Sequence, residues 1–490
     1  MICAVELQPA ARSAFVQGSY SAALLSACRT PLVARRGCPV AVKNTALRTS
    51  LVGIDLGTSN STVACLQDGN AVIVPAADGG RFTPSVVALS KAGAEALVGQ
   101  AAIEASRSSG DFEAYRSVKR LIGRRHSEVV KLLKTPPPGL CSTKRGEAAL
   151  WSTHRQGLIS PEEVFAILVK QLVQQAVCFL GQQVEGAVIT VPADFRATQR
   201  QAIRRAAEMA GLANVQLLQE PIAAALACGA GHAQADENVL VFDLGGGTLD
   251  VSLLDSFEGA LEVLDIDGDG HLGGNDFDQA FANWLLPRHM LNEQATSIRA
   301  DSASWARFLS WAEAAKVRLS EAPAVMSDLD GTSQAPSRQM QLTQQDLEEA
   351  TWGLRKRLWA PLARMGLRSC IHWQICPPPG ADTDRSECVR PEGPKPHIPG
   401  SQQVRDYSPP PRRVTRLVMV GGSSRIPWVR QFVAAATGVQ PSSDVDPEEC
   451  VALGAAIYAG MLSGHIAGIE LADGAYAQDL HGRSSGFPLA

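Results

Sequence analysis

Two stretches of the chain share one pattern of apolar and polar positions. Residues 53–63, GIDLGTSNSTV, run from an apolar segment into Asp55, turn at a glycine and continue in alternation. Residues 241–254, VFDLGGGTLDVSLL, again run from an apolar segment through Asp243 and a glycine turn. Apolar and alternating segments on either side of a glycine turn predict a β-hairpin in each stretch.

Three further segments change from strand-like to helix-like periodicity. Residues 186–212 begin as a continuous apolar run and continue as an amphipathic helix. Residues 215–229 give a short strand and an alanine-rich helix, with Glu220 immediately before a proline at the first helical position. Residues 414–438 give a third strand, glycine turn and helix. This alternation predicts an α/β fold.

The two glycine turns are suited to binding phosphate. A tight turn leaves successive backbone N–H groups pointing into the bend, and glycine lets the chain approach a ligand closely. One such turn alone is more often a plain hairpin. Asp55 and Asp243 would repel phosphate unless a divalent cation lay between them, so they predict hydrated Mg²⁺. Two such turns facing each other predict a two-sided clamp on one nucleotide.

Composition excludes several classes of protein. A chain of 490 residues is long enough for two or more lobes. With 45 basic and 49 acidic residues, the net charge of −4 indicates neither a nucleic-acid nor a membrane-surface partner. No uninterrupted apolar run approaches the roughly 20 residues that cross a bilayer. We expect a soluble monomer.

The eleven cysteines include no CxxC pair. Cys370, Cys376 and Cys388 lie near His372 and His397, but without zinc-finger spacing. We therefore expect free thiols in a reducing compartment rather than a metal site.

Two segments differ in composition from the rest of the chain. Residues 1–50 carry six basic residues and one acid and are rich in alanine and serine, which predicts an organellar transit peptide, cleaved near residues 45–50. The predicted destination is the chloroplast, with the mitochondrion and an untargeted extension as alternatives. Residues 373–413 contain ten prolines without periodicity and predict a disordered insertion.

Residues 265–276, DIDGDGHLGGND, fit two other motifs in part. They match an EF-hand loop at several positions, with Asp in place of Glu at the twelfth, and Gly268, Gly270 and Gly273 form a GxGxxG. The preceding residues alternate like a strand, so the entering helix of an EF-hand is missing. Neither calcium nor a dinucleotide is expected here.

Eight motifs together resemble the 70-kDa heat-shock chaperones, whose ATPase domain has the two-lobed fold of actin and the sugar kinases. In the family's order they are GIDLGTSNS, VKRLIGRR, VITVPADF, QEPIAAALACG, VFDLGGGTLDVS, GDGHLGGNDFD, VGGSSRIP and DPEECVALGAAI. The resemblance covers about residues 51–465 apart from the proline-rich insertion. It implies duplicated ribonuclease-H-like lobes around a nucleotide cleft, at residues 51–238 and 239–465, with a returning C-terminal helix and a tail at 466–490.

The resemblance implies ATP or ADP with Mg²⁺, and possible K⁺, as ligands. Lys119 would offset negative charge at the γ-phosphate, although alone it would be a solvated basic position. The first phosphate loop would be Gly57, Thr58 and Ser59, and the second Gly245, Gly246, Gly247 and Thr248. The hydrated Mg²⁺ would be held by Asp55, Glu220 and Asp243, with Asp250 placing a monovalent cation or water.

The nucleoside is expected to bind in the second lobe. Glu313, Lys316 and Ser320 share one helical face, which alone would be a solvated face. Arg425 would stack its guanidinium on the adenine ring. The further nucleotide contacts implied are Gly273, Gly274, Gly421, Gly422, Ser423 and Glu448.

The resemblance also implies a chaperone ATPase that works with a J-domain cochaperone, a nucleotide-exchange factor and unfolded clients. Only about 25 residues follow Gly464, too few for the family's peptide-binding β-sandwich, so we expect partners to act in trans. Asp194 replaces the family's tyrosine, whereas Pro192 and Arg200, which couple the lobes, are present. A small-molecule kinase and a nucleotide-binding scaffold with little turnover remain alternatives.

Overall fold

The computed structural model describes most of the chain between residues 50 and 471. The described ranges are 50–91, 96–108, 110–133, 136–231, 236–257, 260–289, 292–329, 338–374, 412–443, 445–466 and 470–471. The predicted transit peptide lies outside them except for Ser50, as do the tail beyond residue 471 and nearly all of the proline-rich insertion.

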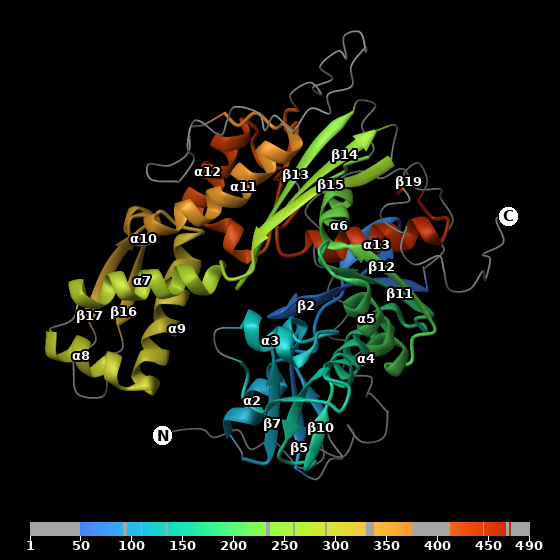
Figure 1. Cartoon of the computed structure of the whole chain (residues 1–490), viewed down its shortest axis with the longest axis horizontal. Helices are drawn as coiled ribbons and strands as arrows, with labels where there is room; N and C mark the ends of the chain where they lie inside the picture. The colour runs from blue at the N-terminus through green and yellow to red at the C-terminus, as the bar shows by residue number, and fades with distance from the viewer. Residues whose placement is uncertain are drawn as a thin grey trace, which may run out of the picture.

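The described part of the chain forms two lobes, each built on its own central sheet (Figure 1). In the first lobe the main sheet has the order β12-β11-β1-β2-β3, with β4 also pairing β2. Strands β11 and β12 run parallel to β1, whereas β2 is antiparallel to it. The strands are β1 (Leu51–Leu56), β2 (Asn60–Gln67), β3 (Asn70–Ile73), β4 (Thr83–Pro84), β11 (Gly186–Val191) and β12 (Asn214–Gln219).

Smaller elements complete the first lobe. Two three-stranded sheets have the orders β6-β5-β7 and β10-β9-β8. Their strands are β5 (Val86–Ser90), β6 (Ala96–Val98), β7 (Phe112–Arg116), β8 (Leu140–Ser142), β9 (Ala148–Ser152) and β10 (Gly157–Ile159). The helices are α2 (Gln100–Ser108), the 3₁₀ turn η2 (Val118–Arg120), α3 (His126–Leu132), α4 (Pro161–Leu180), α5 (Ala197–Met209) and α6 (Glu220–Ala227).

The second lobe is centred on a sheet of order β18-β13-β14-β15-β19. Its strands are β13 (Glu237–Leu244), β14 (Leu249–Phe257), β15 (Ala260–Asp269), β18 (Arg416–Val420) and β19 (Glu470–Leu471), with β16 (Ala324–Leu329) and β17 (Arg338–Thr343) as a separate hairpin. The helices are α7 (Gly274–His289), α8 (Asn292–Ala300), α9 (Ser302–Leu319), α10 (Gln344–Thr351), η3 (Trp352–Leu354), α11 (Arg355–Ser369), η4 (Gly422–Arg425), α12 (Pro427–Thr437) and α13 (Cys450–Leu462).

Both glycine-turn hairpins predicted from the sequence are confirmed. Strands β1 and β2 pair antiparallel with Asp55 opposite Thr62. Strands β13 and β14 do the same, with Asp243 opposite Asp250. The strand-to-helix segments also form as predicted, as β11–α5, β12–α6 and β18–α12.

A shared apolar core joins the lobes. One cluster contains Val188 of the first sheet, Val241 of the second, most of α6 and the buried face of α13. The packing is too close for side chains at two positions: a Cβ on Gly454 of α13 would collide with the Ala223 backbone of α6, and one on Gly53 of β1 with the α13 backbone. The last described helix, α13, therefore returns from the second lobe onto the first.

One described helix, α4, is long and apolar enough by length and composition to cross a membrane. Its charged residues interrupt the apolar run, so the sequence pattern did not single it out. Nine of its residues are buried, mostly in the core of the first lobe, where it packs on α5 and β2. These contacts account for its composition as that of a core helix.

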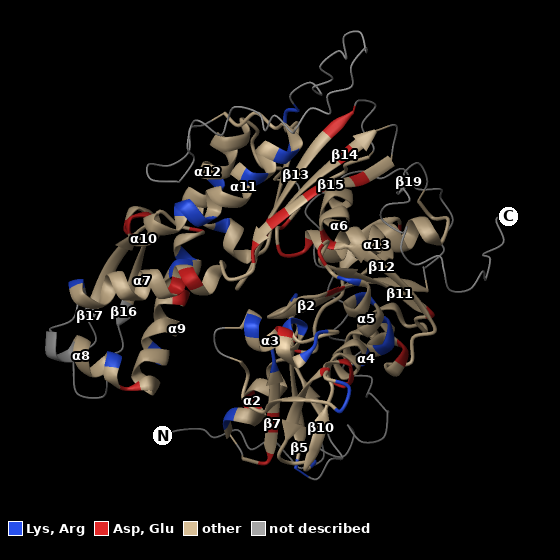
Figure 2. Cartoon of the chain, viewed as in Figure 1, with Lys and Arg blue, Asp and Glu red and all other residues tan. Residues whose placement is uncertain are grey.

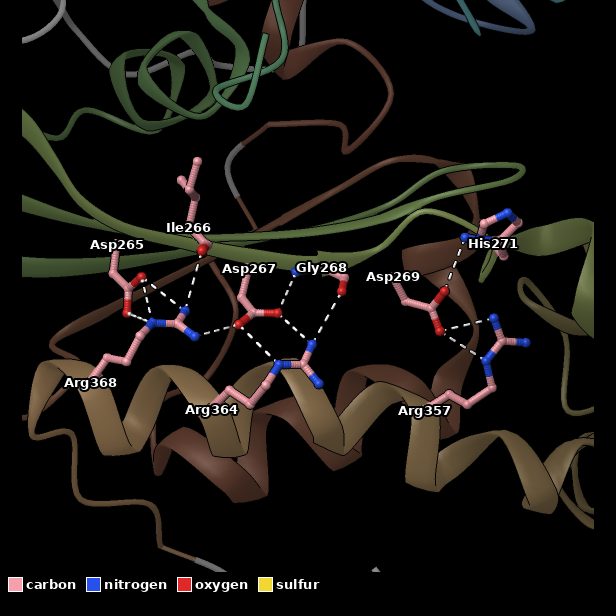
Figure 3. A network of polar contacts seen from close by, with 9 residues as sticks. All are labelled: Asp265, Ile266, Asp267, Gly268, Asp269, His271, Arg357, Arg364 and Arg368. Atoms are coloured by element: carbon pink, nitrogen blue, oxygen red, sulfur yellow. Dashed lines mark hydrogen bonds and ion pairs between the residues drawn. The ribbon is translucent and has the colours of Figure 1, made fainter. Parts of the chain in front are cut away.

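A ladder of ion pairs holds α11 against β15 (Figure 3). Arg368 contacts Asp265 at 2.9 Å and Asp267 at 2.8 Å, and Arg364 contacts Asp267 at 2.5 Å. Asp269 is bound by Arg357 at 2.9 Å. These aspartates are positions 1, 3 and 5 of the EF-hand-like motif, and here they lie on a strand and face arginines.

Six of the eleven cysteines lie within the described residues. The six described cysteines are all free thiols: Cys65, Cys141, Cys178, Cys228, Cys370 and Cys450. Cys376, Cys388 and His397 lie outside the described residues.

The Gly454 contact predicts a large cost for a single methyl group. Gly454→Ala should push α13 away from Ala223 and lower the free energy of unfolding by about 1–3 kcal/mol. Gly353→Ala is the matched control, because no heavy atom lies within 4 Å of its new Cβ. Thermal unfolding of both variants checks this, and equal midpoints would contradict the packing argument.

Candidate functional site

The two glycine turns face each other across the junction of the lobes. An ideal Cβ on Gly246, in the second turn, would lie 3.5 Å from Ser59 Oγ in the first. The first turn is tight, since a Cβ on Gly57 would collide with the Asn60 carbonyl. Ser85 Oγ donates a hydrogen bond to the Gly57 carbonyl at 2.8 Å and supports the turn from behind.

The second turn rests on the start of α7. Gly274 N donates to Gly245 O and Asn275 N donates to Gly246 O, both at 2.9 Å. A Cβ on Gly273 would collide with the Gly247 backbone, so two glycine segments approach at backbone distance. This contact explains why Gly273 and Gly274 lie beside the second turn although they come later in the chain.

Four acidic side chains and one lysine meet next to these turns. Lys119 Nζ forms an ion pair with Glu220 Oε1 at 2.6 Å, and both side chains are largely buried. Thr190 Oγ1 donates a hydrogen bond to Asp55 Oδ1 at 3.1 Å. Asp243 and Asp250 approach from the second lobe. Sequence-predicted residues from both lobes therefore converge on one place.

The three aspartates of this cluster have raised pKa values. Burial raises the pKa of Asp55 to about 6, with Lys119 opposing the shift. Burial, reinforced by the charge of Glu220 and of Asp194, raises the pKa of Asp250 to about 7. Burial and Asp250 also raise the pKa of Asp243. The cluster carries more negative charge than Lys119 offsets.

Lys119 remains the cation of the pair. Burial alone would lower its pKa, but Glu220, Asp55 and Asp243 outweigh burial and hold the pKa of Lys119 above its usual value. A permanently charged lysine therefore lies among the carboxylates of both lobes.

A cavity of about 330 Å³ opens beside the cluster, between the first lobe and β15. Acidic positions follow β15 and surround α6, with basic positions on α11 (Figure 2). The lining residues are Pro192, Ala193, Asp194, Glu220, Pro221, Val241, Asp243, Asp250, Ser252, Ile266, Asp267, Gly268, Asp269, Gly270 and Val420. A cavity with this many carboxylates favours a positively charged occupant.

The donor set fits a hydrated Mg²⁺. Within the described residues, no three His, Cys, Asp or Glu side chains converge closely enough to coordinate an ion directly. Mg²⁺ commonly keeps several waters and uses one or two carboxylates with substrate phosphates, so this spacing is compatible with it. The raised pKa values of Asp55 and Asp243 show carboxylates that a nearby cation would stabilise.

The predicted nucleoside residues lie farther along the second lobe. Lys316 is buried, forms an ion pair with Asp278 at 2.7 Å and would lie 3.3 Å from a Cβ on Gly274. Glu313 is exposed on the same helix, and Ser320 caps its end with Oγ bound to Lys316 O. Of these three residues, Lys316 is the one that is buried and not on a solvated helix face.

Arg425 lies between two acids of the segment that precedes α13. It forms ion pairs with Asp446 and, at 3.2 Å, with Glu448. A Cβ on Gly421 would lie 2.7 Å from Asp243 Oδ1, and one on Gly422 would lie 3.0 Å from Glu448 Oε1. Ser423 is buried and meets Gly274. Arg425 and Glu448 are therefore adjacent. Gly422 lies next to Glu448, and Gly421 lies next to Asp243.

Four residues of this region were missed by the sequence reasoning. Thr190, Asp278 and Asp446 lie within the quoted motifs but had no predicted role, and each is now seen to contact a partner elsewhere in the chain. Arg120 is one of four basic residues between positions 119 and 125 and had no predicted role, yet a Cβ on Gly247 would collide with its guanidinium. Its position directly after Lys119 was the one available signal.

Comparison with known proteins identifies a family. The profile described as "Hsp70 protein" matches residues 51–368 and 397–475. The chain is 37% identical over 427 residues to chaperone protein dnaK3 of Thermosynechococcus vestitus, covering 86% of this chain and 57% of that protein. It is 36% identical over 431 residues to chaperone protein dnaK of Cyanidioschyzon merolae, covering 86% and 63%.

A third relative comes from a distant bacterium. Chaperone protein DnaK of Thermus thermophilus is 36% identical over 432 residues, which cover 86% of this chain and 62% of that protein. The chain thus spans between half and two thirds of the length of the curated relatives it matches.

The raised pKa of Asp250 predicts a pH-dependent cost in the nucleotide-free protein. An unfolded aspartate ionises near 3.8 and folded Asp250 near 7, so the folded protein holds the extra proton between these values. Stability from this residue is therefore greatest below pH 3.8 and lost as the pH rises to 7. Asp250→Asn should raise the free energy of unfolding at pH 8 by up to about 4 kcal/mol.

Urea unfolding in EDTA at pH 8 and at pH 4.5 checks this expectation. The difference between variant and parent should shrink toward the lower pH, since the parent carboxyl is then protonated in the folded state. An equal gain in the free energy of unfolding at both pH values would contradict the raised pKa of Asp250. Asp236→Asn serves as a control for loss of one acidic charge outside the cluster.

Proposed function

Because the chain belongs to the Hsp70 family, we propose that it binds ATP with Mg²⁺ between its two lobes and hydrolyses it as a chaperone ATPase. The observation that carries this proposal is the Lys119–Glu220 ion pair, which lies among the buried carboxylates of both lobes beside two facing glycine turns. A simple nucleotide-binding surface has no need of a buried lysine among acids.

The phosphates would lie between the two turns. Backbone N–H groups of Gly57, Thr58 and Ser59 would bind them from the first lobe, and those of Gly245, Gly246, Gly247 and Thr248 from the second. Asp55, Glu220 and Asp243 would hold the hydrated Mg²⁺, and Asp250 would place K⁺ or water. Bound Mg²⁺ would neutralise phosphate charge and orient the terminal phosphate.

Lys119 would act on the transition state. In phosphoryl transfer the protein contributes mainly positioning and charge stabilisation. Lys119 is kept charged by Glu220, Asp55 and Asp243, so it offers a fixed positive charge without reorganisation during the reaction. The nucleoside would extend along the second lobe toward Lys316 and Arg425, with the Arg425 guanidinium on the adenine.

The wider assignment follows from the relatives. They are named chaperone proteins and come from cyanobacteria, algae and other bacteria. We propose that the chain assists protein folding with a J-domain cochaperone and a nucleotide-exchange factor, and that it works in a plastid. The division into lobes at 51–238 and 239–465 is part of the same proposal, with α13 packed against the first lobe.

Lys119→Ala should separate binding from hydrolysis. We expect nucleotide affinity to stay within a few-fold of the parent, while single-turnover hydrolysis falls by about 100-fold or more, because the lysine acts mainly on the transition state. Lys131→Ala, at an exposed position of α3, is the control for loss of one charge. Equal single-turnover rates in Lys119→Ala and parent would remove Lys119 from the mechanism.

Removal of divalent metal should stop turnover. EDTA is expected to reduce phosphate release to background and added Mg²⁺ to restore it, since the buried carboxylates and the phosphates would otherwise repel each other. Phosphate should appear free in solution without any added sugar, which separates an ATPase from a small-molecule kinase. Nucleotide binding with no metal-dependent phosphate release would support the scaffold alternative instead.

A further inference from the structure

Two adjacent cations on one short turn take different partners. The 3₁₀ turn η2 carries both Lys119 and Arg120. Lys119 pairs with Glu220 and is further attracted by Asp55 and Asp243. Among the described residues, no carboxylate forms an ion pair with Arg120. The positive charge of Lys119 is shared with acids, whereas that of Arg120 is not.

Arg120 reaches from the first lobe to the second phosphate turn. Arg120 is partly buried, and its guanidinium occupies the space that a Cβ on Gly247 would need. An ideal Cβ on Gly247 would collide with Arg120 Nη2 and would lie 3.4 Å from Cζ. Chain neighbours aside, no other heavy atom lies within 4 Å of that Cβ, so the absence of a side chain at Gly247 makes room for the guanidinium.

The charged groups of the site have different surroundings. Asp55, Glu220, Asp243 and Asp250 interact electrostatically with one another and with Lys119. The Arg120 guanidinium instead lies beside Gly247 of the second glycine turn. Arg120 is partly buried and has no acid partner among the described residues. Such a cation is suited to an anion, because the guanidinium and the backbone N–H groups of the turn could donate to the same oxygens.

We propose that Arg120 binds the terminal phosphate of ATP from the first lobe while the Gly245–Gly247 turn binds it from the second. This inference rests on the proposed binding of ATP. A guanidinium presents a rigid fork of donors that matches two phosphate oxygens, which a compact ammonium does not. ADP lacks the group that spans the two lobes, so Arg120 distinguishes ATP from ADP.

Equilibrium binding of a non-hydrolysable ATP analogue and of ADP, both with Mg²⁺, tests the proposal. In Arg120→Ala the affinity for the analogue should fall about 10- to 100-fold, as for loss of a charged hydrogen bond, and the affinity for ADP less than threefold. Arg120→Lys should recover only part of the difference. Arg116→Ala, an exposed arginine four residues earlier, is the charge-matched control and should bind both ligands like the parent.

Gly247→Ala gives an independent readout. Its methyl group would meet only the mobile end of Arg120, so it should displace the guanidinium and weaken the analogue preferentially, as Arg120→Ala does. If both changes act through one contact, the double variant should lose far less than the product of the two single losses. Full multiplicativity would show that Gly247 acts through the backbone turn and not through Arg120.

The outcomes separate this inference from the proposed function. If the parent binds and hydrolyses ATP but Arg120→Ala weakens both ligands equally, or neither, the role of Arg120 is wrong and the ATPase proposal stands. If the parent binds neither ligand, the proposed function fails and the role of Arg120 fails with it. A circular-dichroism melt of each variant excludes loss of folding as the cause of weak binding.

Discussion

The contact between α13 and α6 sets the positions of the elements around the site. At Gly454 the two helices approach until backbone meets backbone, and at Gly53 the same helix touches β1. Because no side chains intervene, the helices cannot shift apart without losing apolar contacts that both sheets share. Asp55 lies near the end of β1, Glu220 begins α6 and Asp243 lies near the end of β13, so this packing brings the three acids together.

That convergence is electrostatically unfavourable in the absence of ligands. Burial raises the pKa values of Asp55, Asp243 and Asp250, and one lysine cannot offset them. A protein keeps such a cluster against its own stability when a ligand supplies the missing positive charge. The same acids explain why Lys119 is held in its charged form. Burial of several carboxylates close together therefore both lowers the stability of the folded chain and makes the site suitable for a cation.

Local pattern predicted the elements of the site but not their partners. The glycine hairpins and the strand-to-helix segments follow from periodicity within about 25 residues, and all of them form. Contacts between distant segments have no such signal: Thr190 meets Asp55 across a parallel strand pair, and Asp446 meets Arg425 through a bend. Arg120 shows most clearly what local pattern cannot predict. It is one of several basic residues between positions 119 and 125, and their sequence does not indicate which side chain faces the site.

The alternating aspartates of β15 also encode alignment. Asp265, Asp267 and Asp269 lie two residues apart, so all three point to the face that α11 covers, while Ile266 points to the opposite face (Figure 3). The strand contains a bulge opposite Leu253 and Leu254, where its pairing register with β14 shifts. A slip by one residue would turn every carboxylate away from its arginine and place Ile266 and glycine positions against the guanidinium groups. The charges on this strand therefore favour one pairing register of the sheet over the registers shifted by one residue.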